Sequence, residues 1–230
     1  MKTKGISQEA LKLIACLTML LDHTAAVLVY DYWPYVIMRG LGRIAFPIFC
    51  FLLVEGFHYT KSPGKYALRL LIGAVLAELP FDLALLGGIN WEYQNVMVTM
   101  LLGFGALWAM KNCKNLFLKG LVSVPFILLG DQLRTDYGSY GVLLIALMGF
   151  FRDLPMGKLM QCVCICLVCA MIPSLDIRIG GLRISLELFG VLSIFPILLY
   201  FGKKHTGNKL VQWGFYLFYP AHLAVLCFLA

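Results

Sequence analysis

The chain has 230 residues, of which 61% are hydrophobic and only 13% are charged. A soluble domain of this size carries about 25% charged residues, so the composition argues against a water-soluble globular protein. The apolar residues come in long runs and lack the ten-residue alternation of a membrane β-barrel. The sequence therefore predicts an all-α, polytopic transmembrane helix bundle, because a helix satisfies its backbone groups within one crossing of the hydrocarbon.

Nine spans are expected, in one transmembrane domain that covers residues 1–230. The first apolar run is too long for a cleavable signal peptide and lacks a small-residue cleavage site. No polar linker is long enough to hold a soluble domain, and no internal repeat is visible. The expected spans are 9–30, 35–57, 66–86, 95–110, 116–130, 138–151, 158–173, 183–201 and 210–229.

The net charge of +7 is divided unevenly between the two ends of these spans. The side that holds the N-terminus carries 14 basic residues and the other side carries 5, so the positive-inside rule places the N-terminus in the cytoplasm and the C-terminus outside. Basic loops of this kind contact lipid head groups, and none has the size and interleaved aromatic residues of a nucleic-acid surface. The first set is Lys2, Lys4, Lys12, Lys61, Lys65, Arg69, Lys111, Lys114, Lys119, Arg152, Lys158, Lys203, Lys204 and Lys209, and the second is Arg39, Arg43, Arg134, Arg178 and Arg183.

Eight cysteines, four of them between Cys162 and Cys169, raise the question of a metal site. A zinc site needs convergent thiolate or imidazole ligands, and one helix cannot supply four of them. No second Cys/His pair has matching spacing. We therefore expect neither a metal nor a disulfide, and interpret the cysteines as small, polarizable packing residues.

Asp22 and His23 lie side by side inside the first expected span. An ionisable residue at the centre of a span costs about 2.5–3.5 kcal/mol on insertion scales and usually faces the bundle interior or a wet cavity. The pair is either part of a functional site or a structural pair that bonds to neighbouring helices. Because neighbours on a helix point about 100° apart, Asp22 is expected to orient a partner other than His23.

Other ionisable side chains fall near the same depth on other spans. Arg43 lies near the middle of the second span with Arg39 one turn farther out, and His222 lies near the middle of the ninth. Glu78 and Asp82 are four residues apart near the outer end of the third span. These helices can converge on a polar chamber. In the alternative interpretations, Glu78 and Asp82 neutralise the two arginines, Arg39 snorkels outward, and His222 is a packing residue.

Prolines interrupt three of the spans that carry these residues. Pro47, Pro80 and Pro220 each remove a backbone donor, which kinks a helix and frees a carbonyl. Broken membrane helices are tolerated where they line a cavity, although membrane helices also contain more proline than soluble ones. We favour the cavity for the three together.

A basic cluster of Lys61, Lys65 and Arg69 lies around the start of the third span. Lys65 and Arg69 are four residues apart on one helix face, a spacing that can clamp a diphosphate. The same residues serve equally as a positive-inside signal. No glycine-rich phosphate loop of the Walker or dinucleotide type is present.

Six stretches, taken in their order and spacing, resemble the TraX family of membrane proteins, and the resemblance runs nearly end to end. The stretches are Leu11 to His23 (LKLIACLTMLLDH), Arg39 to Phe57 (RGLGRIAFPIFCFLLVEGF), Lys65 to Asp82 (KYALRLLIGAVLAELPFD), Asn95 to Thr99 (NVMVT), Asp136 to Val142 (DYGSYGV) and Phe215 to Leu223 (FYLFYPAHL).

The resemblance implies an acyltransferase of the bacterial cytoplasmic (inner) membrane. The family's namesake acetylates the N-terminus of the F-type pilin subunit, and TraX-like proteins are similar to integral-membrane enzymes that take acyl groups from acyl-CoA. In those enzymes a basic residue followed eleven positions on by a histidine in the first span is the catalytic signature, a spacing that Lys12 and His23 have. The implied CoA-binding residues are Lys65 and Arg69, although the wider group commonly has a closer-spaced arginine pair.

The expected reaction moves an acyl group from cytosolic acetyl-CoA, as co-substrate, to a peptide N-terminus or a glycan or lipid acceptor. His23 would be the general base and Arg43 the oxyanion stabiliser. The rival classes are a proton-coupled transporter and a non-catalytic assembly factor of a conjugation or secretion apparatus. The candidate residues are His23, Asp22 and Arg43 for catalysis, Arg39, Glu78, Asp82, Tyr219 and His222 for substrate binding, and Lys65, Arg69 and Lys61 for the cofactor.

Overall fold

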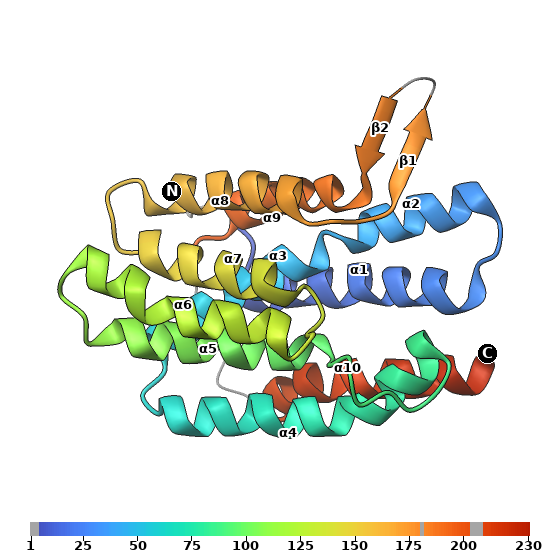
Figure 1. The fold of residues 1–230 in the computed structure, drawn as a ribbon, viewed down its shortest axis with the longest axis horizontal. Helices are drawn as coiled ribbons and strands as arrows, with labels where there is room; N and C mark the ends of the chain where they lie inside the picture. Colours follow the sequence, from blue (N-terminus) through green and yellow to red (C-terminus); the bar gives the residue numbers. More distant parts are fainter. Residues whose placement is uncertain (1–4, 180–181, 203–208) are drawn as a thin grey trace.

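The computed structural model describes residues 5–179, 182–202 and 209–230. Those residues are predominantly helical, and the long helices lie side by side with the chain reversing direction between them (Figure 1). The expectations for Lys2, Lys4, Lys203 and Lys204 lie outside the described residues.

The helices follow the expected apolar runs to within three residues at either end. This agreement includes the two runs between 116 and 151, so the helical reading of the sequence is confirmed. In chain order the elements are α1 (Gln8–Leu28), α2 (Tyr32–Gly42), α3 (Ala45–Tyr59), α4 (Pro63–Phe81), the π-helical turn η1 (Asp82–Leu86), α5 (Val96–Lys111), α6 (Leu116–Gln132), α7 (Gly138–Phe151), α8 (Gly157–Met171), the strands β1 (Asp176–Ile179) and β2 (Leu182–Ser185), the 3₁₀ helix η2 (Leu186–Ser193), α9 (Ile194–Leu199) and α10 (Lys209–Leu229).

Two helical stretches, Gln8–Leu28 and Tyr32–Tyr59, are long and apolar enough by length and composition to cross a membrane. Several shorter apolar helices accompany them, among them α5, α7 and α8. Large apolar side chains stay exposed on the outward helix faces, such as Leu13, Val75 and Phe117. A lipid environment removes the cost that water would impose on such a surface, and the protein is therefore membrane-associated.

Several helices begin where a polar side chain caps them. Ser7 accepts a hydrogen bond from the Ala10 N–H at 3.1 Å before α1, and Asn95 accepts one from the Met97 N–H at 2.9 Å before α5. Asn115 does the same before α6. Each cap satisfies a donor that the first helical turn leaves free, which fixes where these helices start.

The second expected span is broken at Arg43 and Ile44, between α2 and α3. Pro47 has no N–H with which to bond the carbonyl of Arg43, four residues earlier, so the helix cannot continue unbroken through this point. Gly42 lies on the α1 side of the break, where an added Cβ would come within 2.3 Å of the Asp22 side chain. The break and the glycine together bring α2 close to α1.

The other two prolines have smaller effects. Pro80 lies inside α4, one residue before its last, and the chain continues directly as the π-helical turn η1. Pro220 lies inside α10, which runs on to Leu229. Of the three predicted interruptions, the one at Pro47 therefore separates two helices, the one at Pro80 changes the helix type, and the one at Pro220 leaves one continuous helix.

The all-α prediction is wrong between residues 176 and 185. Strands β1 and β2 pair antiparallel there, with Ile177 opposite Ile184 and Arg178 opposite Arg183, so the eighth expected span does not begin at 183. Figure 1 shows this hairpin projecting outward from the side of the helix bundle, next to α2 and across the direction of the helices.

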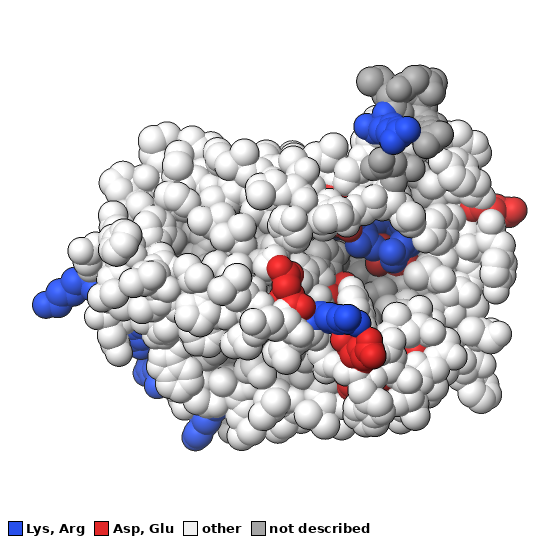
Figure 2. All heavy atoms as spheres, viewed as in Figure 1, with Lys and Arg blue, Asp and Glu red and all other residues white. Residues whose placement is uncertain are grey.

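The two ends of the bundle differ in charge. On the face drawn in Figure 2, the end away from the hairpin shows lysine and arginine alone, whereas red and blue atoms mix around a hollow at the hairpin end. We call these the basic end and the hairpin end. Lys61 and Lys114 lie at the basic end, in the connections α3–α4 and α5–α6, and Lys111 ends α5 there. Asp31, Glu92 and Asp131 lie at the hairpin end.

Candidate active site

A cavity of about 670 Å³ lies between α1, the α2–α3 break, α4 and α10. Its wall on α1 includes residues from Gln8 to Ala26, a length of about 27 Å at 1.5 Å rise per residue. The inner cavity, as we call it, therefore extends along most of the helix, from the basic end toward the hairpin end. A long and thin ligand fits this shape better than a compact one.

Two cations line the inner cavity toward the basic end. Lys12 on α1 lies 5.2 Å from the centroid of the Phe215 ring, and Arg69 on α4 lies 5.3 Å from that of Tyr66 and 5.7 Å from that of Tyr216. The Arg69 Nε is buried without a hydrogen-bond partner. Aromatic faces thus hold both cations in the wall of the inner cavity.

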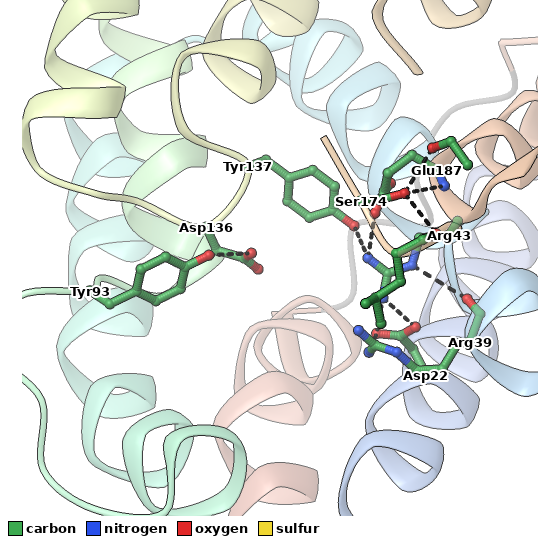
Figure 3. A network of polar contacts seen from close by, with 10 residues as sticks. Asp22, Arg39, Arg43, Tyr93, Asp136, Tyr137, Ser174 and Glu187 are labelled. Atoms are coloured by element: carbon green, nitrogen blue, oxygen red, sulfur yellow. Dashed lines mark hydrogen bonds and ion pairs between the residues drawn. The ribbon is translucent and has the colours of Figure 1, made fainter. Parts of the chain in front are cut away.

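Toward the hairpin end, four charged residues on three segments form what we call the arginine cluster: Asp22, Arg39, Arg43 and Glu187 (Figure 3). Asp22 accepts hydrogen bonds from Arg39 Nη1 at 2.6 Å and from Arg43 Nη2 at 2.5 Å. Arg43 Nη1 pairs with Glu187 on η2 at 2.8 Å. The cluster is electrically balanced, with two cations and two carboxylates, which is what makes ion pairs tolerable away from water.

Every nitrogen of the Arg43 guanidinium already has a hydrogen-bond partner. Besides Asp22 and Glu187, it donates from Nη1 to the Tyr137 hydroxyl at 3.2 Å and from Nε to the Arg39 carbonyl at 3.4 Å. These contacts use all three nitrogens, and a guanidinium carries five N–H donors in total. Arg43 is thus a structural centre that ties α1, η2 and the α6–α7 loop together.

Arg39 is less constrained than Arg43. Its side chain is 21% exposed, against 10% for Arg43, and its Nε is buried without a hydrogen-bond partner. It lines the inner cavity beside Tyr35, whose ring centroid lies 5.9 Å away. Of the two arginines, Arg39 is the one that retains a donor for an anionic group.

His23 also lines the inner cavity, and a chain of hydrogen bonds defines its protonation. The His222 Nδ1 lies 2.7 Å from the Phe218 carbonyl, an acceptor only, so this nitrogen carries the proton. The His222 Nε2 of the neutral ring is then an acceptor, and it lies 2.6 Å from His23 Nδ1. His23 Nδ1 must therefore donate, which leaves His23 Nε2 as the unprotonated nitrogen of a neutral, cavity-lining imidazole.

The chain matches the family described as "TraX protein" over residues 7–230. The chain belongs to the TraX family. Its similarity extends to a protein of Dichelobacter nodosus named "Probable fimbrial assembly protein FimC, serogroup H1", at 32% identity with 94% of this chain and 93% of the relative covered. A Rickettsia prowazekii (strain Madrid E) protein, named "Uncharacterized protein RP591", is 26% identical over 73% of this chain and 64% of the relative. No solved structure matches the chain.

In this TraX family member, the predicted residues divide into those that line the inner cavity and those that do not. Asp22, His23, Arg39, Arg43, Arg69 and Tyr219 line it. His222 supports His23 from behind the wall. Asp22 bonds to the two arginines and not to His23, as the geometry of helix neighbours predicted.

Glu78 and Asp82 do not neutralise the arginines, and that alternative is wrong. Glu78 accepts hydrogen bonds from Asn95, through its amide and its backbone N–H. Asp82 accepts one from the Asn90 N–H at 2.8 Å. Neither is among the residues that line the inner cavity. Both secure the loop before α5, which removes the geometric basis for placing them against substrate.

Lys61 and Lys65 also lie outside the inner cavity. Both are exposed around the start of α4, whereas Arg69, one turn farther along, faces inward. The partner of Arg69 across the inner cavity is Lys12, which the sequence singled out only for its spacing to His23. Elsewhere in the described ranges, no three His, Cys, Asp or Glu side chains gather as a metal site.

The sequence reasoning missed Glu187, Tyr137 and Asp136. Glu187 is a single acid inside the apolar run 183–201, the same signal that drew attention to Asp22. Asp136 and Tyr137 fall in the DYGSYGV stretch, to which no role was given. Tyr93, in the loop before α5, donates a hydrogen bond from its hydroxyl to Asp136 Oδ1 at 3.2 Å. No pattern in the sequence predicts that these two loops come together.

Proposed function

We propose that this TraX family member is an integral-membrane acyltransferase that moves an acetyl or longer acyl group from acyl-CoA to an amine. One observation carries the proposal: His23, whose hydrogen bonds leave Nε2 without a proton, lines a cavity that extends to two cations near the basic end. A general base must lie where substrate can reach it, and a thioester on a long, thin arm can reach this one.

The proposed topology has nine membrane spans with the N-terminus in the cytoplasm of a bacterial cell. The charge difference between the basic end and the hairpin end supports it. CoA would then enter from the cytoplasmic side, with its phosphates near Lys12 and Arg69. The expected phosphate clamp of Lys65 with Arg69 is replaced in this proposal, because Lys65 does not line the inner cavity.

The chemical step needs one base and one oxyanion donor. His23 Nε2 takes a proton from the amine nitrogen as its lone pair attacks the thioester carbonyl carbon. The tetrahedral intermediate then collapses, the C–S bond breaks, and the imidazolium returns the proton to the leaving thiolate. The products are an amide and free CoA, with protons and charge balanced.

Arg39 is the proposed oxyanion donor in place of Arg43. Its Nε lacks a hydrogen-bond partner, whereas the Arg43 nitrogens are all engaged. One such donor contributes typically about 2.7–4 kcal/mol to transition-state stabilisation. Asp22 acts through Arg39, which it holds at 2.6 Å, and is a positioning residue in this scheme.

The proposed setting is a pilus-related or conjugation-related process, and the proposed acceptor is a peptide N-terminus. Membership of the TraX family and the similarity to a relative named as a probable fimbrial assembly protein support this setting. An amine acceptor also suits a neutral histidine base, because the nitrogen loses its proton only as the new bond forms.

The test is turnover of labelled acetyl-CoA by the purified protein with membrane-fraction acceptors, followed by mass spectrometry. His23→Ala is expected to reduce acceptor labelling by about 10²–10⁴-fold, the usual contribution of a general base. His58→Ala is the matched control, because His58 is a half-exposed histidine that pairs with Asp153 at the end of α3. Equal labelling by wild type and His23→Ala would remove His23 from the mechanism.

A proton-coupled transporter is the second candidate, favoured by a further hollow beyond the hairpin end of the inner cavity. A transporter would show flux driven by a pH gradient in vesicles that contain no CoA. An assembly factor without catalysis would support pilus formation with His23→Ala as well as with the wild type. Either result would overturn the acyltransferase proposal.

A further inference from the structure

The loop between α6 and α7 forms a wall at the hairpin end of the inner cavity. Asp136, Tyr137 and Gly138 make up this segment, which we call the DYG loop. Its backbone is fixed to the loop before α5, with the Asp136 N–H donating to the Gln94 carbonyl at 2.8 Å and the Gln94 N–H donating to the Arg134 carbonyl at 3.1 Å. Thr99 on α5 donates its hydroxyl to the Asp136 carbonyl.

Tyr137 is held in an unfavourable backbone conformation. Its φ is +66°, in the left-handed region that bulky residues rarely adopt. The conformation directs its ring onto Phe46, with 3.7 Å between ring centroids, and its hydroxyl to Arg43. Such conformations persist where surrounding contacts enforce them, and they concentrate at functional sites.

A second hollow of about 250 Å³ lies on the other side of this wall. We call it the outer hollow. Its lining includes Thr135, Tyr140, Pro173 and Glu187, from the segments near the hairpin end. Four residues line both spaces: Arg43, Tyr93, Asp136 and Tyr137. The inner cavity and the outer hollow are therefore neighbours that share one thin partition.

Asp136 is the charged member of this partition that lacks a counter-ion. The two arginines of the arginine cluster are already balanced by Asp22 and Glu187. Within the described residues Asp136 makes no ion pair, and its side-chain contact is the Tyr93 hydroxyl at 3.2 Å from Oδ1. Figure 3 shows the Tyr93–Asp136 pair apart from the arginine cluster, with the Tyr137 ring between them.

A half-buried carboxylate without a cation favours a cationic ligand. We propose that Asp136 binds the ammonium group of the acceptor at the partition, and that the outer hollow receives the chain that carries it. The ammonium gives one proton to the Asp136 carboxylate, which later loses it to water, and the neutral amine that results is the nucleophile that attacks with His23 as base. This inference rests on the proposed function and deepens it, because it assigns the site that would hold the acceptor amine and discriminate it from a hydroxyl. A neutral hydroxyl acceptor would gain little from a negative charge at this point.

The test compares binding of two synthetic probes to the purified protein in lipid nanodiscs. One is a short apolar peptide amide with a free α-amine, and the other is its α-hydroxy analogue, which carries no charge. The wild type is expected to bind the amine probe about tenfold more tightly than the hydroxy probe, a difference typical of one charge-assisted contact. Asp136→Asn is expected to bind both probes equally.

Two further variants separate recognition from folding. Asp136→Glu restores the charge and is expected to recover part of the amine preference. Glu92→Gln removes another carboxylate of the hairpin end, one that is exposed and pairs with Arg134, and should leave the preference unchanged. A wild type without amine preference, or an Asp136→Asn variant that retains it, would overturn the inference.

CoA release is recorded in the same samples, so that the two proposals fail separately. An amine preference that depends on Asp136 in a protein that never releases CoA would refute the acyltransferase and leave the binding site in place. Turnover of acetyl-CoA with equal use of both probes by the wild type and Asp136→Asn would do the reverse.

Discussion

The arginine cluster and the His23–His222 pair lie close together and differ in how completely their polar atoms are bonded. The nitrogens of Arg43 are all engaged, and its carboxylate partners are nearly buried. The histidine pair instead ends in a nitrogen that no described contact uses. The comparison teaches that ionisable residues in apolar helices serve two purposes. Saturated groups hold segments together, and unsaturated groups are available for chemistry.

The largest expected effect tests whether Arg43 holds the arginine cluster together. Arg43→Met leaves Asp22 and Glu187 without their shared partner, and breaking a buried pair in this way costs about 3–5 kcal/mol of unfolding free energy. Arg39→Met should cost less, about 1–3 kcal/mol, because Asp22 keeps Arg43. Reversible unfolding in mixed micelles measures both. Equal losses would mean that Arg43 is not the centre of the cluster.

The next largest effect tests whether the His23–His222 pair serves catalysis. His222→Leu removes the acceptor that orients His23, and it should lower kcat about 10- to 100-fold, less than the 10²–10⁴ expected for loss of the base itself. His222→Gln keeps a side-chain acceptor and should restore part of the rate. Acyl-CoA binding should not change in either variant. If His222 served packing alone, His222→Leu would be more stable than His222→Gln, and neither variant would change kcat.

A smaller effect compares two cations of one helix. Arg69→Gln should raise KM for acetyl-CoA about tenfold, the loss of one charge-assisted contact, because Arg69 lines the inner cavity. Lys65→Gln, one turn earlier and exposed, should leave KM within twofold of the wild type. Initial rates over a range of acetyl-CoA concentrations distinguish the two. A larger effect at Lys65 would return the phosphate site to the start of α4.

The smallest effect concerns pH. The pKa of the Asp136 carboxyl is raised to about 6, chiefly by burial, with Arg43 and the Tyr93 hydroxyl lowering it and Glu187 and Asp22 adding to the rise. An α-amine stays protonated throughout this range. Lowering the pH from 7 to 5.5 neutralises the carboxylate, so the amine preference should fall about fourfold for a group that titrates near 6. The Asp136→Asn variant should show no such fall.

Much of the fold follows from the sequence because apolar runs and proline act locally. The break at Arg43 lies four residues before Pro47, where a missing N–H predicts it. The hairpin could also have been found: Ile177 and Ile179 alternate before Gly180 and Gly181, and Leu182 and Ile184 alternate after them. Reading 183–201 as one apolar run concealed this shorter period.

The site is less predictable because it depends on which helix faces meet. Lys65 and Arg69 share a face by spacing, yet only the packing of α4 against α10 decides that Arg69 lines the inner cavity. Similarly, Glu78 and Asp82 have the right charge to pair with the arginines, but Glu187 is the residue that reaches Arg43. Sequence spacing gives the direction of a side chain on its own helix and not the identity of its partner.

The break between α2 and α3 has a mechanical consequence. A straight helix transmits a displacement at one end along its whole length, whereas a break lets the helix on one side rotate relative to the other. Arg39 lies on α2 and Arg43 at the break itself, and both donate hydrogen bonds to Asp22. A displacement of α2 is therefore transmitted, through two guanidinium groups, to Asp22, the residue next to His23.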